Sequence, residues 1–469
     1  MMAQRPLFPI GIILLAIWLL SGCSRPHVMH SSYPTLDVPT QWSRQTISGR
    51  VTANDDRWWT CFNDSQLTAL IDKALRTNND LAFAALKVRK AKLEAGLVNT
   101  NRVPDVQLLG EVSAAKDLAH SSTSTRNQSV SLTLNYEVDL WGKLAQSRNA
   151  AEWKARATEH DRRSTALTLI GTTAQLYWQI AALNHKIALE QENMAAMQKI
   201  VALVTIQHQA GKISGLDKAQ IEQQLAMQYT RLTNQHYARD KARHALAILF
   251  NQPPQQREVE RTQLPSFSLL PPSLGVPADI LSQRPDVQAA EWRVRKNLAE
   301  EYAEKASFYP TLSIASSLSS DGAAATQVTL ADLLKAPIGT LSATLILPIV
   351  QWNTAQLKIK VSHIEYEQSV VHFRKTFYQA LADVENALSA HTQYQEENKY
   401  QQDAYQQAVK ATHLAQIRYQ AGKTSLREWL DQQKNQYQAA IALEENRYNQ
   451  FTTLMTLYLA LGGYHTSFG

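Results

Sequence analysis

Polar and apolar residues alternate strictly over residues 129–140, in the stretch SVSLTLNYEVDL. A period of two is typical of a β-strand with one apolar and one polar face. Three other stretches alternate in the same way, so we predict strands at about 104–116, 128–140, 310–320 and 340–350. Each strand has about the ten residues that a tilted strand needs to cross a membrane.

Long helices are expected to follow the strands. The segment from about Lys143 to Gln209 contains no proline, and as a helix it would be on the order of 100 Å long. Its apolar residues repeat at coiled-coil spacing: Ile180, Ile187, Met194 and Val201 at sevens, with Leu176, Leu183, Met197 and Val204 between them. The first helix is expected in the stretch SQLTALIDKALR, with Asp64 as its N-cap. Further helices are expected at about Asp80–Asn101, Leu216–Phe250, Thr354–Gln420 and Leu426–Leu461.

The chain repeats itself. The stretch NDLAFAALKVRKAK (79–92) aligns with PDVQAAEWRVRKNL (285–298), and Pro104 then matches Pro310. Trp141 matches Trp352, and QAGK at 209–212 recurs at 420–423. The second group of matches has an offset five residues larger than the first. An internal duplication of this size predicts two copies of one structural unit.

Four strands do not close a barrel, and lipid does not tolerate open sheet edges. Either the strands form a soluble sheet, or several chains contribute four strands each. The strand length favours the second arrangement, and so does the N-terminus.

The N-terminus has the features of a secretion signal. Arg5 precedes the apolar run Ile10–Leu20, which is too short to span a bilayer of ~30 Å as a helix. The run ends in Leu20-Ser21-Gly22-Cys23, which resembles a bacterial lipobox. The resemblance implies removal of residues 1–22 and acylation of Cys23, with diacylglycerol on its sulfur and an acyl chain on its amino group. Because Ser24 is not the aspartate of inner-membrane retention, it implies the outer membrane.

Composition and chemistry exclude several classes of function. The net charge is +6, with basic and acidic residues interspersed, so no nucleic-acid groove is indicated. The thirteen histidines lack metal-ligand spacing, and no phosphate loop or Gly-x-Ser-x-Gly motif occurs. We therefore expect neither an enzyme nor a resident metal or cofactor. With Cys23 acylated, Cys61 has no disulfide partner and is expected to be a small buried residue.

Six motifs in order resemble the TolC-like outer-membrane factors, in particular the lipoprotein branch of tripartite RND-type efflux systems. They are RWW (57–59) ahead of DSQLTALIDKAL, YEVDLWG (136–142), LSQRPDVQAAEWRVR (281–295), FYPTLSI (308–314) and YQAGKTS (419–425). The resemblance covers essentially the whole mature chain. The sequence departs from the family at Val350-Gln351-Trp352-Asn353, where a Phe-Asp-Gly-Gly-like turn is usual.

The resemblance implies a mainly α fold with a transmembrane β-barrel: a trimer with twelve strands in one barrel and twelve helical columns in a periplasmic tunnel. Trp141 would then be an interfacial aromatic or a plain packing residue. The implied function is a passive exit duct for drugs or other toxic small molecules, with a periplasmic adaptor and an inner-membrane transporter as partners. The alternatives are a lipid-anchored coiled-coil scaffold without a pore and a type I protein secretion channel.

The same resemblance assigns residues at the far end of the long helices. Gly211, Lys212, Ser214, Gly422, Lys423 and Ser425 would form the tips that dock the adaptor. Asp217, Tyr419, Glu428 and Asp431 would form the channel gate, where threefold symmetry turns each carboxylate into a ring that attracts cations.

The expected organisation has six parts. They are a signal peptide (1–22), a lipid-anchored extended segment (23–63), a first repeat (64–250), an equatorial linker (251–277), a second repeat (278–461) and a C-terminal tail (462–469).

We predict that Cys23→Ser leaves an unprocessed or mislocalised form, because the thiol is the acylation site. Mass spectrometry of the mature N-terminus checks this. A mature N-terminus elsewhere, or no acyl mass on Cys23, would contradict it. Partial insertion is still expected, because the strands supply their own affinity for the membrane.

Overall fold

The computed structural model describes residues 36–43, 57–116, 124–265, 277–279, 283–323, 338–347 and 352–463. The predicted signal peptide, Cys23, most of the extended segment and residues 350–351 of the divergent turn lie outside this range. The chain divides into Met1–Asp37 and Val38–Gly469, and the second unit is described below.

The elements follow one another in the same order twice. The first series is η1 (Trp58–Phe62), α2 (Ser65–Thr77), α3 (Asn79–Asn99), η2 (Thr100–Arg102), β1 (Asp105–Lys116), β2 (Ser124–Val138), α4 (Lys143–Gln209) and α5 (Gly215–Leu249). The second is η3 (Pro277–Asp279), α7 (Pro285–Ala306), β3 (Thr311–Ala323), β4 (Ile338–Ile346), α9 (Trp352–Gln420) and α10 (Leu426–Ala460). Helix, two strands and two long helices thus recur, as expected for a duplicated chain.

Local caps explain where the first helices begin. The Asp64 carboxylate accepts hydrogen bonds from the backbone N–H groups of Gln66 and Leu67, which confirms it as the N-cap of α2. Asn78 caps α3 through its side-chain oxygen and the N–H of Leu81. The predicted and observed bounds of the helices differ by at most two residues. For example, α3 ends at Asn99 instead of Asn101.

The four strands form one antiparallel sheet in the order β1-β2-β3-β4. The register places apolar residues opposite one another, as in Leu108↔Leu132, Leu132↔Leu318 and Leu312↔Leu345. Polar residues are likewise paired, as in Gln107↔Thr133 and Ser317↔Thr340. Because directly opposed residues point to the same side, the sheet has one apolar and one polar face, as the alternation predicted.

Strand β2 begins four residues before the predicted position and ends two residues before it. The early end has a local cause: the N–H of Leu140 bonds to the carbonyl of Val138, and the Asp139 carboxylate turns to the first amides of α4. Both edge strands, β1 and β4, are exposed along their whole length in the chain.

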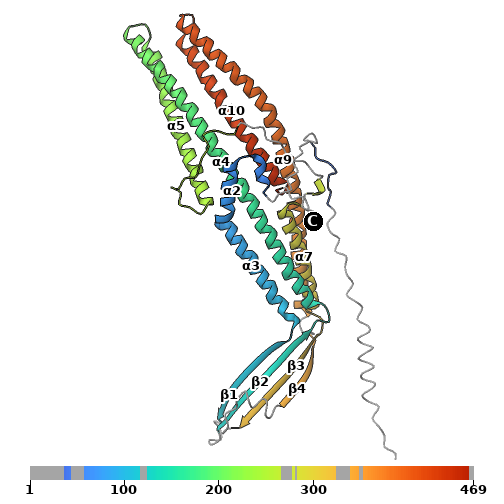
Figure 1. The fold of residues 1–469 in the computed structure, drawn as a ribbon. Helices are drawn as coiled ribbons and strands as arrows, with labels where there is room; N and C mark the ends of the chain where they lie inside the picture. Colours follow the sequence, from blue (N-terminus) through green and yellow to red (C-terminus); the bar gives the residue numbers. More distant parts are fainter. Residues whose placement is uncertain are drawn as a thin grey trace, which may run out of the picture. The chain divides into compact units, whose positions relative to one another are not determined.

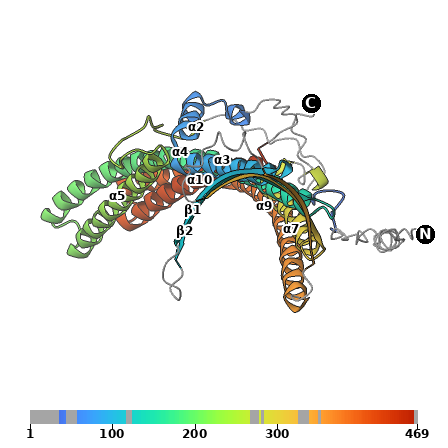
Figure 2. The ribbon, with the colours of Figure 1, turned by 90° about the horizontal axis from the view of Figure 1, so that it is seen from below.

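The helices are arranged side by side. Near the sheet the contact order is α3–α4–α7–α9, and in the other half it is α5–α4–α10–α9 (Figures 1 and 2). The turns between α4 and α5 and between α9 and α10 lie at the end away from the sheet (Figure 1). In the part of the chain that the structure describes, no helix combines the length and the apolar content that crossing a membrane requires.

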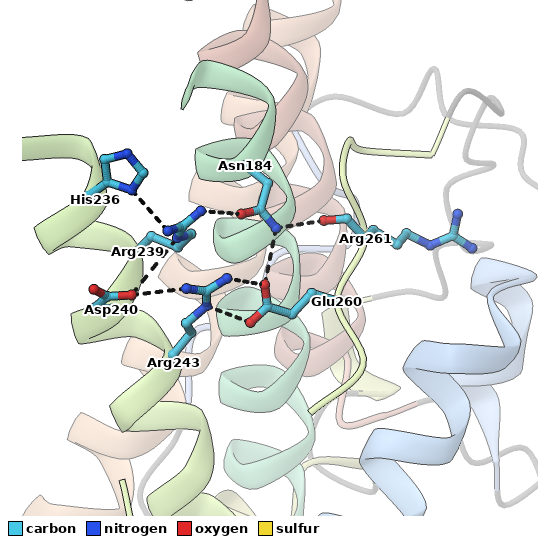
Figure 3. Close-up of polar contacts among 7 residues, drawn as sticks. All are labelled: Asn184, His236, Arg239, Asp240, Arg243, Glu260 and Arg261. Carbon is cyan, nitrogen blue, oxygen red and sulfur yellow. Dashed lines mark hydrogen bonds and ion pairs between the residues drawn. The ribbon is translucent and has the colours of Figure 1, made fainter. Parts of the chain in front are cut away.

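The first part of the predicted linker is pinned across α4 and α5. The Arg243 guanidinium of α5 donates two hydrogen bonds of 2.6 Å to the Glu260 carboxylate (Figure 3). The Asn184 amide of α4 donates to the same carboxylate at 3.3 Å and to the carbonyl of Arg261 at 2.9 Å. Burial raises the pKa of Glu260, but the hydrogen bonds from Arg243 and Asn184 lower it by more. The pKa of Glu260 therefore lies below its ordinary value. Arg261 in turn pairs with Asp64 at 2.9 Å, so the linker also holds the cap of α2.

The prediction that Cys61 is buried is wrong: its side chain is exposed. In the short helix η1 it is the aromatic neighbours that face the interior. Trp58 stacks on Tyr458 at 5.3 Å, and Phe62 lies 5.2 Å from the ring of Trp178. Since these large rings fill the space between η1 and the long helices, Cys61 lies on the outer side.

Part of the N-terminal segment is anchored against α9. Trp42 is buried, and both the backbone N–H and the hydroxyl of Ser43 donate to one oxygen of Glu385, at 2.9 and 3.0 Å. Residues 36–43 have no regular secondary structure, as expected for an extended segment.

The change from strand to long helix is made by a compact corner. The indole N–H of Trp141 donates to the carbonyl of Pro310 at 2.7 Å, and its ring stacks on Tyr309 at 5.1 Å. Gly142 caps α4 with φ at +78°, where the Asp139 carboxylate accepts from the N–H groups of Leu144 and Ala145. Trp141 therefore has a packing role, joining the end of β2 to the segment just before β3.

We predict that Gly142→Ala destabilises the protein by about 1–2 kcal/mol, the cost of a left-handed backbone for a residue with a Cβ. No described atom lies within 4 Å of that Cβ, so backbone strain is the only cause. Gly96→Ala is the matched control: its Cβ is equally free, but it lies inside α3, where alanine stabilises by about 0.5–1 kcal/mol. Thermal unfolding followed by circular dichroism should give shifts of opposite sign. Equal shifts would show that the left-handed backbone at Gly142 is not the cause.

Candidate functional site: the paired helix turns

The turn after α4 is closed by a glycine in a left-handed conformation. Gly211 has φ at +67°, and its N–H donates to the carbonyl of His208 at 2.9 Å. The N–H of Lys212 donates to the carbonyl of Gln207 at 2.9 Å. This pair of bonds is the Schellman motif, which satisfies the last carbonyls of a helix and turns the chain sharply.

The turn after α9 has the same geometry. Gly422 has φ at +69°, with its N–H bonded to Tyr419 at 2.9 Å and the N–H of Lys423 bonded to Arg418 at 2.8 Å. The repeated QAGK motif therefore folds the same way twice. In both turns the lysine side chain is exposed, as a docking tip requires.

Each returning helix begins at a serine of the predicted tips. Ser214 and Asp217 form a capping box: the Ser214 hydroxyl accepts from the N–H of Asp217, and the Asp217 carboxylate accepts from the N–H and hydroxyl of Ser214. Ser425 caps α10 by accepting from the N–H of Glu428 at 3.2 Å, and the Glu428 carboxylate accepts from the hydroxyl of Thr424. Two of the three predicted gate carboxylates thus also stabilise helix starts.

The predicted gate residue Tyr419 joins the two hairpins. Its hydroxyl donates to the Gln207 side-chain oxygen on α4 at 3.0 Å, and its ring stacks on Trp429 of α10 at 5.3 Å. It borders an apolar tip cluster made of Met197, Ile200, Val204, Ile221, Ala415, Leu426, Trp429 and Leu430. The cluster draws on all four long helices, so it fixes the two turns relative to each other.

The fourth gate residue, Asp431, lies one helical turn beyond Glu428, and both are exposed. Within the described ranges neither an ion pair nor a hydrogen bond engages the Asp431 carboxylate. Positions three apart share a helix face, so the two carboxylates project to the same side of α10.

A buried polar layer between the tip cluster and the linker escaped the sequence reasoning. Glu190 of α4 is fully buried, and its carboxylate pairs with Arg231 of α5 at 3.4 Å. Burial raises the pKa of the nearby Tyr437 hydroxyl of α10, and the Glu190 carboxylate raises it further. Glu190 lies inside the predicted seam between Ile187 and Met194, and apolar periodicity gives no signal for a charge there.

The layer continues toward the linker with contacts between α4 and α10. His185 lies 2.9 Å from the buried Glu444 carboxylate, and Lys186 pairs with Glu445 at 2.8 Å. A cavity of about 320 Å³ adjoins Arg231 and Tyr437. In the described residues no group of three histidine, cysteine, aspartate or glutamate side chains is placed to hold a metal ion.

Comparison with known proteins identifies the fold. The family described as Outer membrane efflux protein matches residues 70–252 and 276–463. The chain belongs to this family. The two matched segments coincide with the two series of elements.

The matches to two relatives and to one solved structure cover nearly the whole chain. The pyoverdine export outer membrane protein OpmQ of Pseudomonas putida is 30% identical, over 97% of this chain and 96% of its own. The cation efflux system protein CusC of Escherichia coli is 28% identical, over 95% of this chain and 96% of its own. A crystal structure of CusC is 25% identical, with a TM-score of 0.79 over 92% of this chain and 98% of its own.

These matches confirm the family that the motifs indicated. The outer membrane efflux protein described here is an outer-membrane duct of efflux pumps, as predicted, and it is located in the outer membrane. The roles assigned to individual tip and gate residues stay predictions.

We predict that Tyr419→Phe loosens the tips by about 1 kcal/mol, the worth of one hydrogen bond, because the ring can still stack on Trp429. Trp429→Ala should cost about 3–5 kcal/mol by removing a buried aromatic from the tip cluster. Hydrogen exchange of the amides around the two turns should rise about fivefold in the first variant and far more in the second. Tyr400→Phe, at a largely exposed position of α9, is the control. Unchanged exchange in Trp429→Ala would refute this account.

Proposed function

We propose that three copies of the chain form one closed duct through the outer membrane, with a twelve-strand barrel and a twelve-helix tunnel. The observation that supports this most strongly is that the contacts between the two repeats occur only once within one chain, as between α4 and α7 or between β2 and β3. The counterparts of these contacts would join the second repeat to the first repeat of another chain.

The strand-to-helix corner illustrates the missing contact. Trp141 of the first repeat bonds to Pro310 at the start of β3. Its counterpart Trp352 is 67% exposed at the start of α9, and the counterpart of Pro310 is Pro104, at the start of β1. Trp352 of one chain would therefore lie against Val103 and Pro104 of the next.

Apolar stripes on the outer helices point the same way. Helix α3 exposes Phe83, Leu86, Leu93 and Leu97, and α9 exposes Leu357, Val361, Ile364, Val371 and Tyr378. The counterpart of Leu93 is Ala299 in α7, and that of Val361 is Ala150 in α4, and both alanines are buried within the chain. The exposed stripes would be buried in the same way where α9 of one chain meets α3 of the next.

The contact surfaces on the two sides of the chain differ, so the interface is heterologous, and we infer that it closes into a ring. In that ring β4 of one chain pairs antiparallel with β1 of the next, which leaves no open edge in lipid. Three is the number of copies that the resemblance to TolC-like channels implies.

Within this assembly the protein acts as a passive conduit and not as an enzyme. Acylated Cys23 would add a lipid anchor, an inner-membrane transporter would supply energy, and an adaptor would bridge it to the tips. The cargo would be drugs or other toxic small molecules. A scaffold without a pore is the runner-up, and it gives no reason for a two-faced sheet with open edges.

We predict that Leu93→Asp or Val371→Asp prevents assembly, because each buries an unpaired charge at the interface between chains. Val259→Asp, a similarly exposed apolar position in the linker, is the control. Mass measurement in mild detergent should give three chains for the wild type and the control, and single chains for both interface variants. A one- or two-chain wild type that conducts ions would refute the trimer.

A second prediction concerns the carboxylates of α10. Glu428→Gln with Asp431→Asn should lower cation selectivity and block by divalent cations, because rings of charge would be lost at the narrow entrance. Glu445→Gln, an exposed α10 carboxylate far from the turn, serves as control. The readout is the reversal potential across a planar bilayer under a salt gradient. An unchanged value in an assembled double variant would rule out the ring assignment.

A further inference from the structure

The cavity beside the buried polar layer lies between the two helical hairpins. Its walls come from α4 and α5 of the first hairpin and from α10 of the second. Its volume is about 320 Å³, about twice the size of an apolar protein cavity that can hold benzene. The described lining is largely polar: five amide side chains, two cations and one phenol, with two methionines. A cavity of this size and polarity can hold a small organic molecule.

Two cations and, among the described residues, no carboxylate line this cavity. Arg231 pairs with the buried Glu190 through its Nε at 3.4 Å, and its guanidinium lies 5.6 Å from the centre of the Tyr437 ring. The ion pair leaves the two terminal nitrogens of Arg231 for another acceptor. Lys434 has no acidic partner in the part of the chain that the structure describes. Because Glu190 balances only one of the two positive charges, the cavity favours an anion.

A buried amide oxygen of the lining is unpaired. Gln228 is 3% exposed, and its Oε1 accepts no hydrogen bond from any residue in the described ranges. A buried acceptor without a donor costs free energy, so a ligand that donates an N–H or O–H there is favoured. Met197 and Met227 add apolar side chains to the lining, and methionine adapts its shape to different ligands.

The large side chains of the lining are not required by the duplicated fold. Ser214 and Ser425 relate the two repeats by 211 residues at this end of the molecule. At that spacing five lining residues correspond to alanines: Asn193, Met197, Gln228, Arg231 and Tyr437 correspond to Ala404, Ala408, Ala439, Ala442 and Ala226. The equivalent helices thus carry small side chains at these positions. Amides, a cation and a phenol gathered around one cavity therefore point to binding.

We propose that this cavity binds a small organic carboxylate that also carries an N–H donor and an apolar group, which is the chemistry of an N-acylated amino acid. The carboxylate would bind Arg231 and Lys434. The N–H would donate to the Oε1 of Gln228, and the apolar group would pack on Met197 and Met227. The site lies within one chain, so it does not depend on the proposed ring.

The lining disfavours the simpler ligands. A cation would be repelled by Arg231 and Lys434. An inorganic anion would contact the two cations but would leave Met197 and Met227 without an apolar partner. The proposed ligand would touch α5 and α10 at once, so it would link the two hairpins within their polar layer.

The binding test uses the full chain in detergent and three small probes, with protein-free micelles as the blank. N-Acetylphenylalanine carries all three groups, its carboxamide lacks the charge, and phenylpropionate lacks the N–H. Ligand-observed NMR titration should give one site per chain for N-acetylphenylalanine, with a Kd on the order of 1 mM. The carboxamide should bind about tenfold more weakly. Equal binding of these two probes, or none above the blank, would overturn the proposal.

Variants test the contact made by each side chain. Lys434→Gln should weaken binding of N-acetylphenylalanine about tenfold, because a charge-assisted contact is lost at an exposed position. Gln228→Leu should weaken N-acetylphenylalanine about fivefold and leave phenylpropionate unchanged, because only the first probe donates an N–H. Lys410→Gln, at an exposed position of α9 outside the lining, is the matched control. Wild-type affinity in Lys434→Gln, or an equal loss of both probes in Gln228→Leu, would refute the site.

Hydrogen exchange tests the link between the hairpins. Near saturation, N-acetylphenylalanine should slow exchange of the α10 amides around Tyr437 about threefold in the wild type, and leave it unchanged in Lys434→Gln. Binding without this protection would overturn the placement between α5 and α10. A chain that conducts ions in a planar bilayer but does not bind the probe would refute this site and leave the proposed duct intact.

Discussion

The unpaired backbone at the two edges of the sheet is the constraint on which the rest of the structure depends. Among the described residues, β1 and β4 each have a neighbouring strand on one side only. In hydrocarbon each unpaired group costs several kcal/mol, so a sheet that enters lipid must close. Four strands are too few to close alone. The helices also need a partner chain. Their exposed apolar stripes lie on α3 and α9, the two outer helices in the contact order α3–α4–α7–α9.

The long helices would continue the closed arrangement to the helix turns, at the end away from the sheet. Apolar packing joins the two hairpins at the tips and again where Trp178 of α4 meets Phe451 of α10, while buried charges lie between these regions. Glu190 and Glu444 make few strong hydrogen bonds, so this layer contributes little stability for its degree of burial. The hairpins are therefore held firmly at the tips and near the linker, and weakly between them.

Sequence periodicity predicted the regular elements well, because strand and helix patterns persist over many turns and one face of each element is buried. The alternation also predicted the two faces of the sheet, and Leu108, Leu132 and Leu318 do lie on one face. It gave no register, because a shift by two residues keeps the same residues on that face. Predictions about single side chains were weaker. Cys61 was expected to be buried, but neighbouring tryptophans occupy the interior.

Charged residues were the hardest to predict. Asp217 and Glu428 were assigned to the gate by resemblance alone, and their capping contacts follow from the helix starts at Ser214 and Ser425. Glu190 and Arg231 come together only through tertiary packing, since no local pattern indicates a buried charge in a coiled-coil seam.

Within one chain, the first repeat contacts the second repeat. The central claim is that the second repeat makes the equivalent contacts with the first repeat of the next chain. Cysteines at Val103 and Trp352, in a chain with Cys61→Ser, test this directly under mild oxidation. The account predicts disulfide-linked products of two and three chains and no larger species. Cysteines at the equivalent positions Tyr309 and Trp141 should link only within one chain. An intermolecular product from the second pair, or none from the first, would contradict the claim.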